Sequence, residues 1–411
     1  MNRVPVLALI SLALFSVCHA EPWPQFRGPH GNGIAAHSVL PAKLDQSTVK
    51  WETAIPGKGW SSPVVWDKLI WLTTAAEDGT TMSVIAVDRS TGKVVRDILL
   101  LENEEPRFCH PTNSYASCTP VVTSDRVYVH FGSYLTACLD STTGKELWRR
   151  TDVECDHFRG PASSPILHDG KLIVAFDGVD QQFVVAFDAE TGETVWQTDR
   201  QIDYGTDEGD WMKAYGTAHA ITINGQPQVI SPSASAAIAY EPKSGRPLWS
   251  IQYGGMNASA RPIYSDGLLF LINGMGNMVA AQPGEDGLFS GDRIAWSAKT
   301  AVAKKASPII HNGILYMNSD DGIISARTAA TGEILWRKRV GREFAASPVM
   351  AGQYIYFFGG GGDIITIKPG SNEEPIAQTN LGDGFMASPA VVDNEIILRS
   401  RTKLYCLTQL D

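Results

Sequence analysis

The feature that most constrains the fold of this chain is a sequence unit that occurs eight times in 411 residues. One clear copy, at residues 305–339, reads KASPIIHNGILYMNSDDGIISARTAATGEILWRKR. It contains four short β-prone runs, at 307–310, 314–318, 323–327 and 333–337. The first two runs are joined by Asn312-Gly313, a pair that tolerates the positive φ of a tight hairpin. Each copy therefore predicts a four-stranded antiparallel sheet.

The copies start at a small residue followed by an anchor residue, usually proline. The anchors are Pro63, Pro120, Pro165, His219, Pro262, Pro308, Pro348 and Pro389, spaced 57, 45, 54, 43, 46, 40 and 41 residues apart. Most copies end in a Thr-Gly or Ser-Gly turn and a strand with Trp, as in AFDAETGETVW. Four strands in a repeat of this length is the period of a propeller. We predict an all-β fold, an eight-bladed β-propeller of four-stranded antiparallel blades.

The last copy lacks its fourth strand and the Thr-Gly step. VKWETAI, at residues 49–55, has the missing pattern, with Trp51 in the place of the blade tryptophan. We therefore expect an N-terminal strand to complete the last blade, which removes the free sheet edges. The predicted divisions are a signal peptide at 1–20, an N-terminal tail at 21–48, and the propeller at 49–411.

Two recurring residue types have expected structural roles. The blade tryptophans are predicted to wedge between neighbouring blades. The aspartates before the Thr-Gly turns, Asp88, Asp140 and Asp188, are predicted to cap those turns rather than to bind metal.

The N-terminus has the features of an export signal. Arg3 precedes an apolar run from 4 to 17, and Cys18-His19-Ala20 ends in a small residue. We expect a periplasmic or extracellular protein, monomeric and without a transmembrane segment. The net charge of −10 argues against nucleic acid as a partner.

Five cysteines follow the predicted cleavage point: Cys109, Cys118, Cys138, Cys155 and Cys406. An exported chain can oxidise them, and the odd number leaves at least one free. The expected disulfide joins Cys138 to Cys155, because both lie near one blade edge.

The A-x-D-x-x-T-G-K/E-x-x-W units resemble the tryptophan-docking repeats of the PQQ-like, or quinoprotein-type, eight-bladed propellers. The opening WPQFRGPxGxG also looks like that of exported repeat proteins abundant in planctomycete-type bacteria. The resemblance implies one of two branches. Quinoprotein alcohol dehydrogenases use pyrroloquinoline quinone (PQQ) and calcium, whereas the non-catalytic BamB-like branch serves as a protein-interaction platform. This chain lacks the adjacent cysteine pair typical of the first branch and the loops that lengthen it.

Long loops between blades indicate where a ligand binds. The connections between blades share one face of a propeller, and the longest lie at 101–117 and 199–216, with the loop 152–163 between them. The candidate binding residues on these loops are Arg107, His110, Tyr115, His157, Arg159, Asp203, Tyr204, Asp210 and Trp211.

Several chemistries are open to these loops. Arg107 and Arg159 could hold an anion through bidentate hydrogen bonds, although bracing nearby carbonyls is the commoner role. The remaining alternatives are calcium at Asp203, Asp207, Glu208 and Asp210, zinc at Cys109, His110, Cys155 and His157, a general base at Asp156–His157, and sugar stacking on Tyr115, Tyr204 and Trp211.

The leading hypothesis is an exported, non-catalytic propeller that binds a protein or polysaccharide partner of the cell envelope through the inter-blade loop face of blades 2–4. It needs no cofactor. The alternatives are a PQQ-dependent oxidoreductase with calcium and a carbohydrate-binding propeller. The tetrapeptide FRGP occurs twice, at 26–29 and 158–161. The two copies are out of register with the anchors, so FRGP is not part of the blade repeat, and the tail is expected to pack on the ring.

Overall fold

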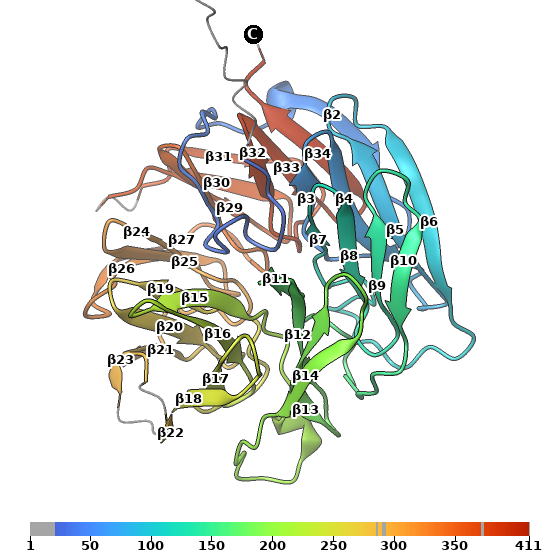
Figure 1. Ribbon diagram of the computed structural model, residues 1–411. Helices are drawn as coiled ribbons and strands as arrows, with labels where there is room; N and C mark the ends of the chain where they lie inside the picture. Colours follow the sequence, from blue (N-terminus) through green and yellow to red (C-terminus); the bar gives the residue numbers. More distant parts are fainter. Residues whose placement is uncertain (1–20, 285–286, 290–292, 371–373, 411) are drawn as a thin grey trace, which may run out of the picture.

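The computed structural model describes residues 21–284, 287–289, 293–370 and 374–410. Eight sheets follow one another in chain order around a central axis, as Figure 1 shows. Each contains a meander of four antiparallel strands, so the predicted eight-bladed β-propeller is confirmed. The predicted signal peptide, residues 1–20, lies outside the described residues.

Each blade runs from an inner strand near the axis to an outer strand. Blade 1 consists of β3 (Val64–Trp66), β4 (Leu69–Ala75), β5 (Thr81–Asp88) and β6 (Val94–Glu102), and blade 2 of β7 (Val121–Val122), β8 (Arg126–His130), β9 (Thr136–Asp140) and β10 (Glu146–Arg150). Blade 3 consists of β11 (Ile166–His168), β12 (Lys171–Asp177), β13 (Gln182–Asp188) and β14 (Thr194–Asp199). Blade 4 consists of β15 (His219–Ile223), β16 (Gln226–Pro232), β17 (Ala236–Tyr240) and β18 (Pro247–Gln252). Blade 5 consists of β19 (Ile263–Ser265), β20 (Leu268–Ile272), β21 (Met278–Ala281) and β23 (Ile294–Ala298), and blade 6 of β24 (Ile309–His311), β25 (Ile314–Asn318), β26 (Ile323–Thr328) and β27 (Ile334–Arg339). Blade 7 consists of β28 (Val349–Ala351), β29 (Tyr354–Phe358), β30 (Asp363–Ile367) and β31 (Ala377–Asn380). Blade 8 consists of β32 (Ala390–Val392), β33 (Glu395–Arg399), β34 (Lys403–Thr408) and the N-terminal strand β2 (Val49–Ala54). A short β22 (Leu288–Phe289) pairs in parallel with β18.

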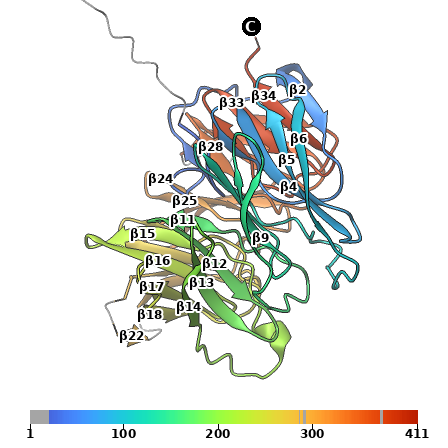
Figure 2. The same ribbon diagram turned by 45° about the vertical axis from the view of Figure 1, so that its right-hand side comes forward.

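The ring closes as the sequence predicts. β2 pairs antiparallel with β34, and Trp51 lies opposite Cys406. The two strands lie side by side in both views (Figures 1 and 2). The last blade therefore joins the two ends of the chain, and β2 covers the edge of β34 that would otherwise be unpaired.

The blade tryptophans wedge between blades, which confirms their predicted role. The indole Nε1 of Trp148, on blade 2, donates to the Ala189 carbonyl of blade 3 at 3.1 Å. A Cβ on Gly192, in the blade 3 turn, would lie 2.7 Å from that indole. Trp51, Trp196 and Trp296 donate to the next blade in the same way. Each indole thus seals the seam beside it.

The turn aspartates also have the expected role. The Oδ1 atoms of Asp88, Asp140 and Asp188 accept backbone N–H groups of their own Thr-Gly turns. Hydrogen bonds from Ser90 and Thr91 lower the pKa of Asp88 to about 2. Each carboxylate accepts the backbone N–H groups of its own turn and so stabilises that turn.

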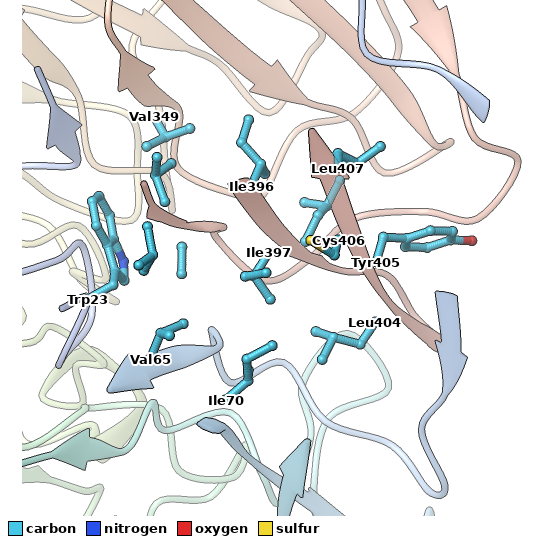
Figure 3. Close-up of a cluster of buried hydrophobic side chains, with 14 of the residues drawn as sticks. Trp23, Val65, Ile70, Val349, Ile396, Ile397, Leu404, Tyr405, Cys406 and Leu407 are labelled. Atoms are coloured by element: carbon cyan, nitrogen blue, oxygen red, sulfur yellow. The ribbon is translucent and has the colours of Figure 1, made fainter. Parts of the chain in front are cut away.

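The N-terminal tail crosses the ring. The backbone of Trp23 exchanges hydrogen bonds with Val65 of blade 1 at 2.8 and 3.0 Å, and the indole joins the buried cluster in Figure 3. β1 (Ile34–Ala35) then pairs in parallel with β28 of blade 7. After η1 (Gln46–Thr48) the chain enters β2. The tail thereby ties blades far apart in the sequence.

The five cysteines among the described residues are all free, so the expected Cys138–Cys155 disulfide is wrong. Both residues belong to one buried cluster, but their sulfur atoms face different groups. The Cys155 Sγ lies 3.9 Å from His157 Nδ1, and the Cys138 Sγ lies 4.0 Å from the Leu139 carbonyl. Over the described part of the chain, no helix is long and apolar enough to cross a membrane.

Candidate functional site

A belt of hydroxyl groups surrounds the axis just before the inner strands. Five of the seven proline anchors directly follow a serine, and a sixth follows a threonine. In blade 1 the Ser62 backbone N–H donates to the Thr119 Oγ1 of blade 2 at 3.0 Å. In five more pairs the backbone N–H of the first residue donates to the side-chain hydroxyl of the second in the next blade: Thr119 to Ser164, Ser164 to Thr217, Ser307 to Ser347, Ser347 to Ser388 and Ser388 to Ser62. The repeated small residue therefore connects neighbouring blades at their inner ends.

Blade 5 departs from this pattern because Arg261 directly precedes its anchor, where blades 1–3 and 6–8 have Ser or Thr. Blade 4 has Ala218 there, and Thr217 supplies its hydroxyl. Its backbone N–H donates to Ser307 Oγ at 2.8 Å. Its guanidinium Nη1 reaches the tail and donates to the Phe26 carbonyl at 2.5 Å. The belt thus contains one cationic residue, and that residue holds the tail.

A cavity of about 470 Å³ opens on the axis, on the face that carries the connections between blades. All eight blades contribute to its wall through these connections. Its polar lining includes six belt hydroxyls, Trp60, Tyr215 and the charged residues Arg159, Lys304, Lys305 and Asp320. The volume is that of a small-molecule or short-peptide site.

The tail forms part of the floor. Phe26 lines the cavity, and the next residue, Arg27, is buried with 2% of its surface exposed. The Arg27 guanidinium donates to four carbonyl groups, those of Asn32, Ser307, Pro308 and Pro348. Burial, together with the neighbouring charge of Arg261, lowers the pKa of Arg27. No carboxylate among the described residues pairs with either guanidinium, so the floor carries excess positive charge.

Two of the predicted binding residues, His110 and Arg159, reach the cavity. The Arg159 carbonyl accepts the His110 backbone N–H at 3.3 Å, so the loops before blades 2 and 3 meet there. The Arg159 Nη2 lies 3.4 Å from Asp210 Oδ2, which brings in the loop before blade 4. Burial raises the pKa of Asp210, but Lys213 and Arg159 outweigh it and the net shift is downward.

Three other predicted residues brace the loops and do not line the cavity. Tyr115 is 7% exposed and its hydroxyl donates to the Arg107 carbonyl at 2.6 Å. The Arg107 Nη1 donates to the Cys155 carbonyl at 3.0 Å, which is the bracing role. His157 is 8% exposed beside Phe176, and burial lowers its pKa to about 4. These side chains position the loops.

The remaining three predicted residues lie outside the cavity lining. Asp203 is exposed and accepts the Gly205 backbone N–H at 2.8 Å. The Tyr204 hydroxyl lies 3.1 Å from Ser233 Oγ, and burial raises its pKa to about 12. Trp211, in η2 (Gly209–Trp211), is 41% exposed. The structure therefore gathers only part of the predicted set.

Comparison with known families identifies the chain. The family model described as outer membrane protein assembly factor BamB matches residues 41–151, 84–338 and 180–411. These overlapping matches cover nearly the whole propeller. The chain belongs to this BamB-like family of PQQ-like repeat propellers.

Individual relatives of this BamB-like chain are distant. Outer membrane protein assembly factor BamB of Yersinia pestis is 24% identical over 168 residues, which is 40% of this chain and 41% of that protein. The counterpart from Moranella endobia is 23% identical over 195 residues, 45% and 49% of the two chains. This chain thus spans less than half the length of these two curated relatives.

Two solved structures share the propeller. BamB from Moraxella catarrhalis aligns with a TM-score of 0.62 at 15% identity, covering 88% of this chain and 99% of that one. A europium-containing methanol dehydrogenase aligns with a TM-score of 0.74 at 11% identity, covering 95% and 98%. Identities this low establish the fold alone.

The donor set of the BamB-like chain does not suit the calcium that accompanies PQQ. Calcium takes six to eight oxygen ligands, with carboxylates prominent. The cavity lining contains one carboxylate, Asp320, and its Oδ2 lies 3.0 Å from Lys305 Nζ. No group of three His, Cys, Asp or Glu suited to a metal occurs within the described ranges, which also leaves the calcium and zinc alternatives without ligands.

Several residues of the cavity of this family member were missed at the sequence level. Trp60 and Lys305 each stand three positions before an anchor proline, as do the lining residues Ser117, Ala162, Ser259, Ala345 and Met386. The signal was the repeat position, not the residue type. Phe108, exposed by 59% beside Phe158, was also missed.

Proposed function

We propose that the chain is a protein-binding propeller of the cell envelope that holds its partner on the inter-blade loop face of blades 2–4. The observation that carries the proposal is an exposed aromatic pair beside the axial cavity. Phe108 is 59% exposed and Phe158 is 44% exposed, and their ring centroids are 6.0 Å apart. Exposed neighbouring aromatic rings are typical anchors of protein interfaces.

We call this pair of rings, Phe108 and Phe158, the aromatic rim, and the neighbouring loop residues fix the position of Phe158. Phe158 has φ 53°, a left-handed conformation that is unfavourable for a bulky residue. The surrounding loop holds it there: Arg159 lies 5.7 Å from the ring centroid and the buried Lys213 ammonium 6.0 Å from it. Strain of this kind concentrates at binding sites, where it presents a side chain in advance.

The relatives support a protein partner over the alternatives. The family model and two curated relatives carry the description outer membrane protein assembly factor. Of the aromatic residues considered for sugar stacking, Tyr115 is buried and Tyr204 bonds to Ser233. The carbohydrate reading therefore rests on Trp211. The envelope location rests on the signal-like residues 1–20, and we propose that the exported chain acts as a monomer.

A photo-crosslinking amino acid at position 158 tests the proposal in cells that export the protein. We expect a discrete adduct with one envelope protein, recovered again when that protein is tagged and captured. Position 195 is the control, because Val195 is 45% exposed on the outer strand of the same blade. Equal labelling from both positions, or no adduct at position 158, would refute the rim as a partner site.

A further inference from the structure

Six hydroxyl groups of the belt line the axial cavity: Ser62, Thr119, Ser164, Thr217, Ser347 and Ser388. Each oxygen accepts a backbone N–H from the neighbouring blade. None of the six donates its own hydrogen to another of the described residues. A hydroxyl is both donor and acceptor, so each can still donate one hydrogen bond to a group on the axis.

Cations outnumber carboxylates around this ring. The lining contains Arg159, Lys304 and Lys305 against the single Asp320, which pairs with Lys305. Arg159 pairs with Asp210, outside the lining, and Asp210 also binds Lys213. Beneath the lining residue Phe26, the guanidinium groups of Arg27 and Arg261 add positive charge that no carboxylate of the described chain balances. The whole chain has a net charge of −10, so this positive site is local. A concave site with an excess of one sign of charge concentrates ligands of the opposite sign.

Converging hydroxyl donors and excess positive charge select a ligand rich in acceptor oxygens and negative charge. Carboxylates meet both conditions, because an ionised carboxylate only accepts hydrogen bonds. The lining also connects directly to the aromatic rim. Arg159 follows the rim residue Phe158 in the chain, and the His110 ring lies 6.5 Å from that of Phe108.

We infer that the axial cavity receives an acidic, extended peptide segment of the partner protein, with its carboxylates among the belt hydroxyls and lysines. The inference rests on the proposed function, since the rim holds the same partner. We assign a peptide to this site for two reasons. Its carboxylates would complement the positive charge of the cavity, and the cavity is continuous with the rim that holds the partner. A free small carboxylate is the competing outcome.

Fluorescence anisotropy tests this with a labelled, glutamate-rich peptide that contains one Phe, and with its glutamine counterpart. The test variant is Lys304→Gln with Lys305→Gln, whose side chains are exposed. The control is Lys93→Gln with Lys145→Gln, two exposed lysines of Thr-Gly turns on the opposite face. We expect the test variant to bind the acidic peptide about tenfold more weakly, the control to match the wild type, and added salt to weaken wild-type binding.

Equal affinity for the acidic and glutamine peptides, or an unchanged affinity in the Lys304/Lys305 variant, would overturn the inference. Free citrate that binds as tightly as the peptide would overturn the peptide assignment and favour a small carboxylate. The crosslinking result separates this from the proposed function. An adduct at position 158 together with an unchanged peptide affinity in the Lys304/Lys305 variant supports the rim and refutes the cavity as the acidic-segment site.

Discussion

Replacing Arg27 with methionine tests whether the tail is an integral part of the propeller. Two of its hydrogen bonds are short, at 2.6 Å to the carbonyls of Asn32 and Pro308, and two are long, at 3.3 Å to Ser307 and Pro348. Hydrogen bonds to a charged group contribute about 1.5–3 kcal/mol each, so the two short ones amount to roughly 3–6 kcal/mol. Methionine also relieves a buried charge and its repulsion with Arg261, which offsets part of this loss.

The net expectation is a loss of about 2–4 kcal/mol in the free energy of unfolding, measured by urea denaturation. Arg342→Met is the control, because Arg342 is exposed and its removal should change stability by less than about 0.5 kcal/mol. Arg27→Lys should lose nearly as much as Arg27→Met, since an ammonium cannot span carbonyls of blades 6 and 7 at once. A loss below about 1 kcal/mol in Arg27→Met would refute the reasoning.

Two further predictions concern stability. Gly192→Ala should lower the free energy of unfolding by about 2–4 kcal/mol in urea denaturation, because φ is 76° and the new Cβ would lie 2.7 Å from the Trp148 indole. The control, Gly170→Ala, should cost only about 1 kcal/mol, because φ is 69° but no atom lies within 4 Å of the new Cβ. Similar costs for the two variants would contradict the wedge role of the indole. The folded-state pKa of His157 is about 4, below its ordinary 6.5, so the unfolded state binds the extra proton first and stability falls as the pH drops from about 6.5 to 4. In His157→Leu, the loss of unfolding free energy between pH 6.5 and 4 should be smaller than in the wild type by up to roughly 3 kcal/mol. An unchanged dependence of stability on pH would contradict this.

The blades were predictable from the sequence because their signals are local and repeated. Asn312-Gly313 marks the first turn of its copy, and the strand expected at 314–318 is found unchanged as β25. Tryptophans equivalent to Trp148 and aspartates equivalent to Asp140 recur at fixed repeat positions. The tryptophan fills the seam between two blades, and the aspartate accepts the N–H groups of the Thr-Gly turn. Eight repetitions of one physical requirement make a pattern that a single sequence reveals.

The site was less predictable because its residues share a position and not a type. Trp60 and Lys305 come from different blades and meet only once the ring has closed. The insertions before blades 2 and 4 drew attention to the loop face of blades 2–4, but length does not tell which side chains point inward. Tyr115 and His157 illustrate this, since both lie on the predicted loops and are buried within them.

The two FRGP copies explain why the axis is cationic. In the first, Arg27 has φ 65° and lies beneath the cavity; in the second, Phe158 has φ 53° and Arg159 forms part of the wall. Both copies turn the chain sharply before Gly-Pro, and both deliver a guanidinium to the axis from segments that enter the ring independently. The tail packs against inner strands around the axis, through its bonds to Val65 of blade 1 and β28 of blade 7. Part of the positive charge at the axis therefore comes from a segment outside the blade repeat.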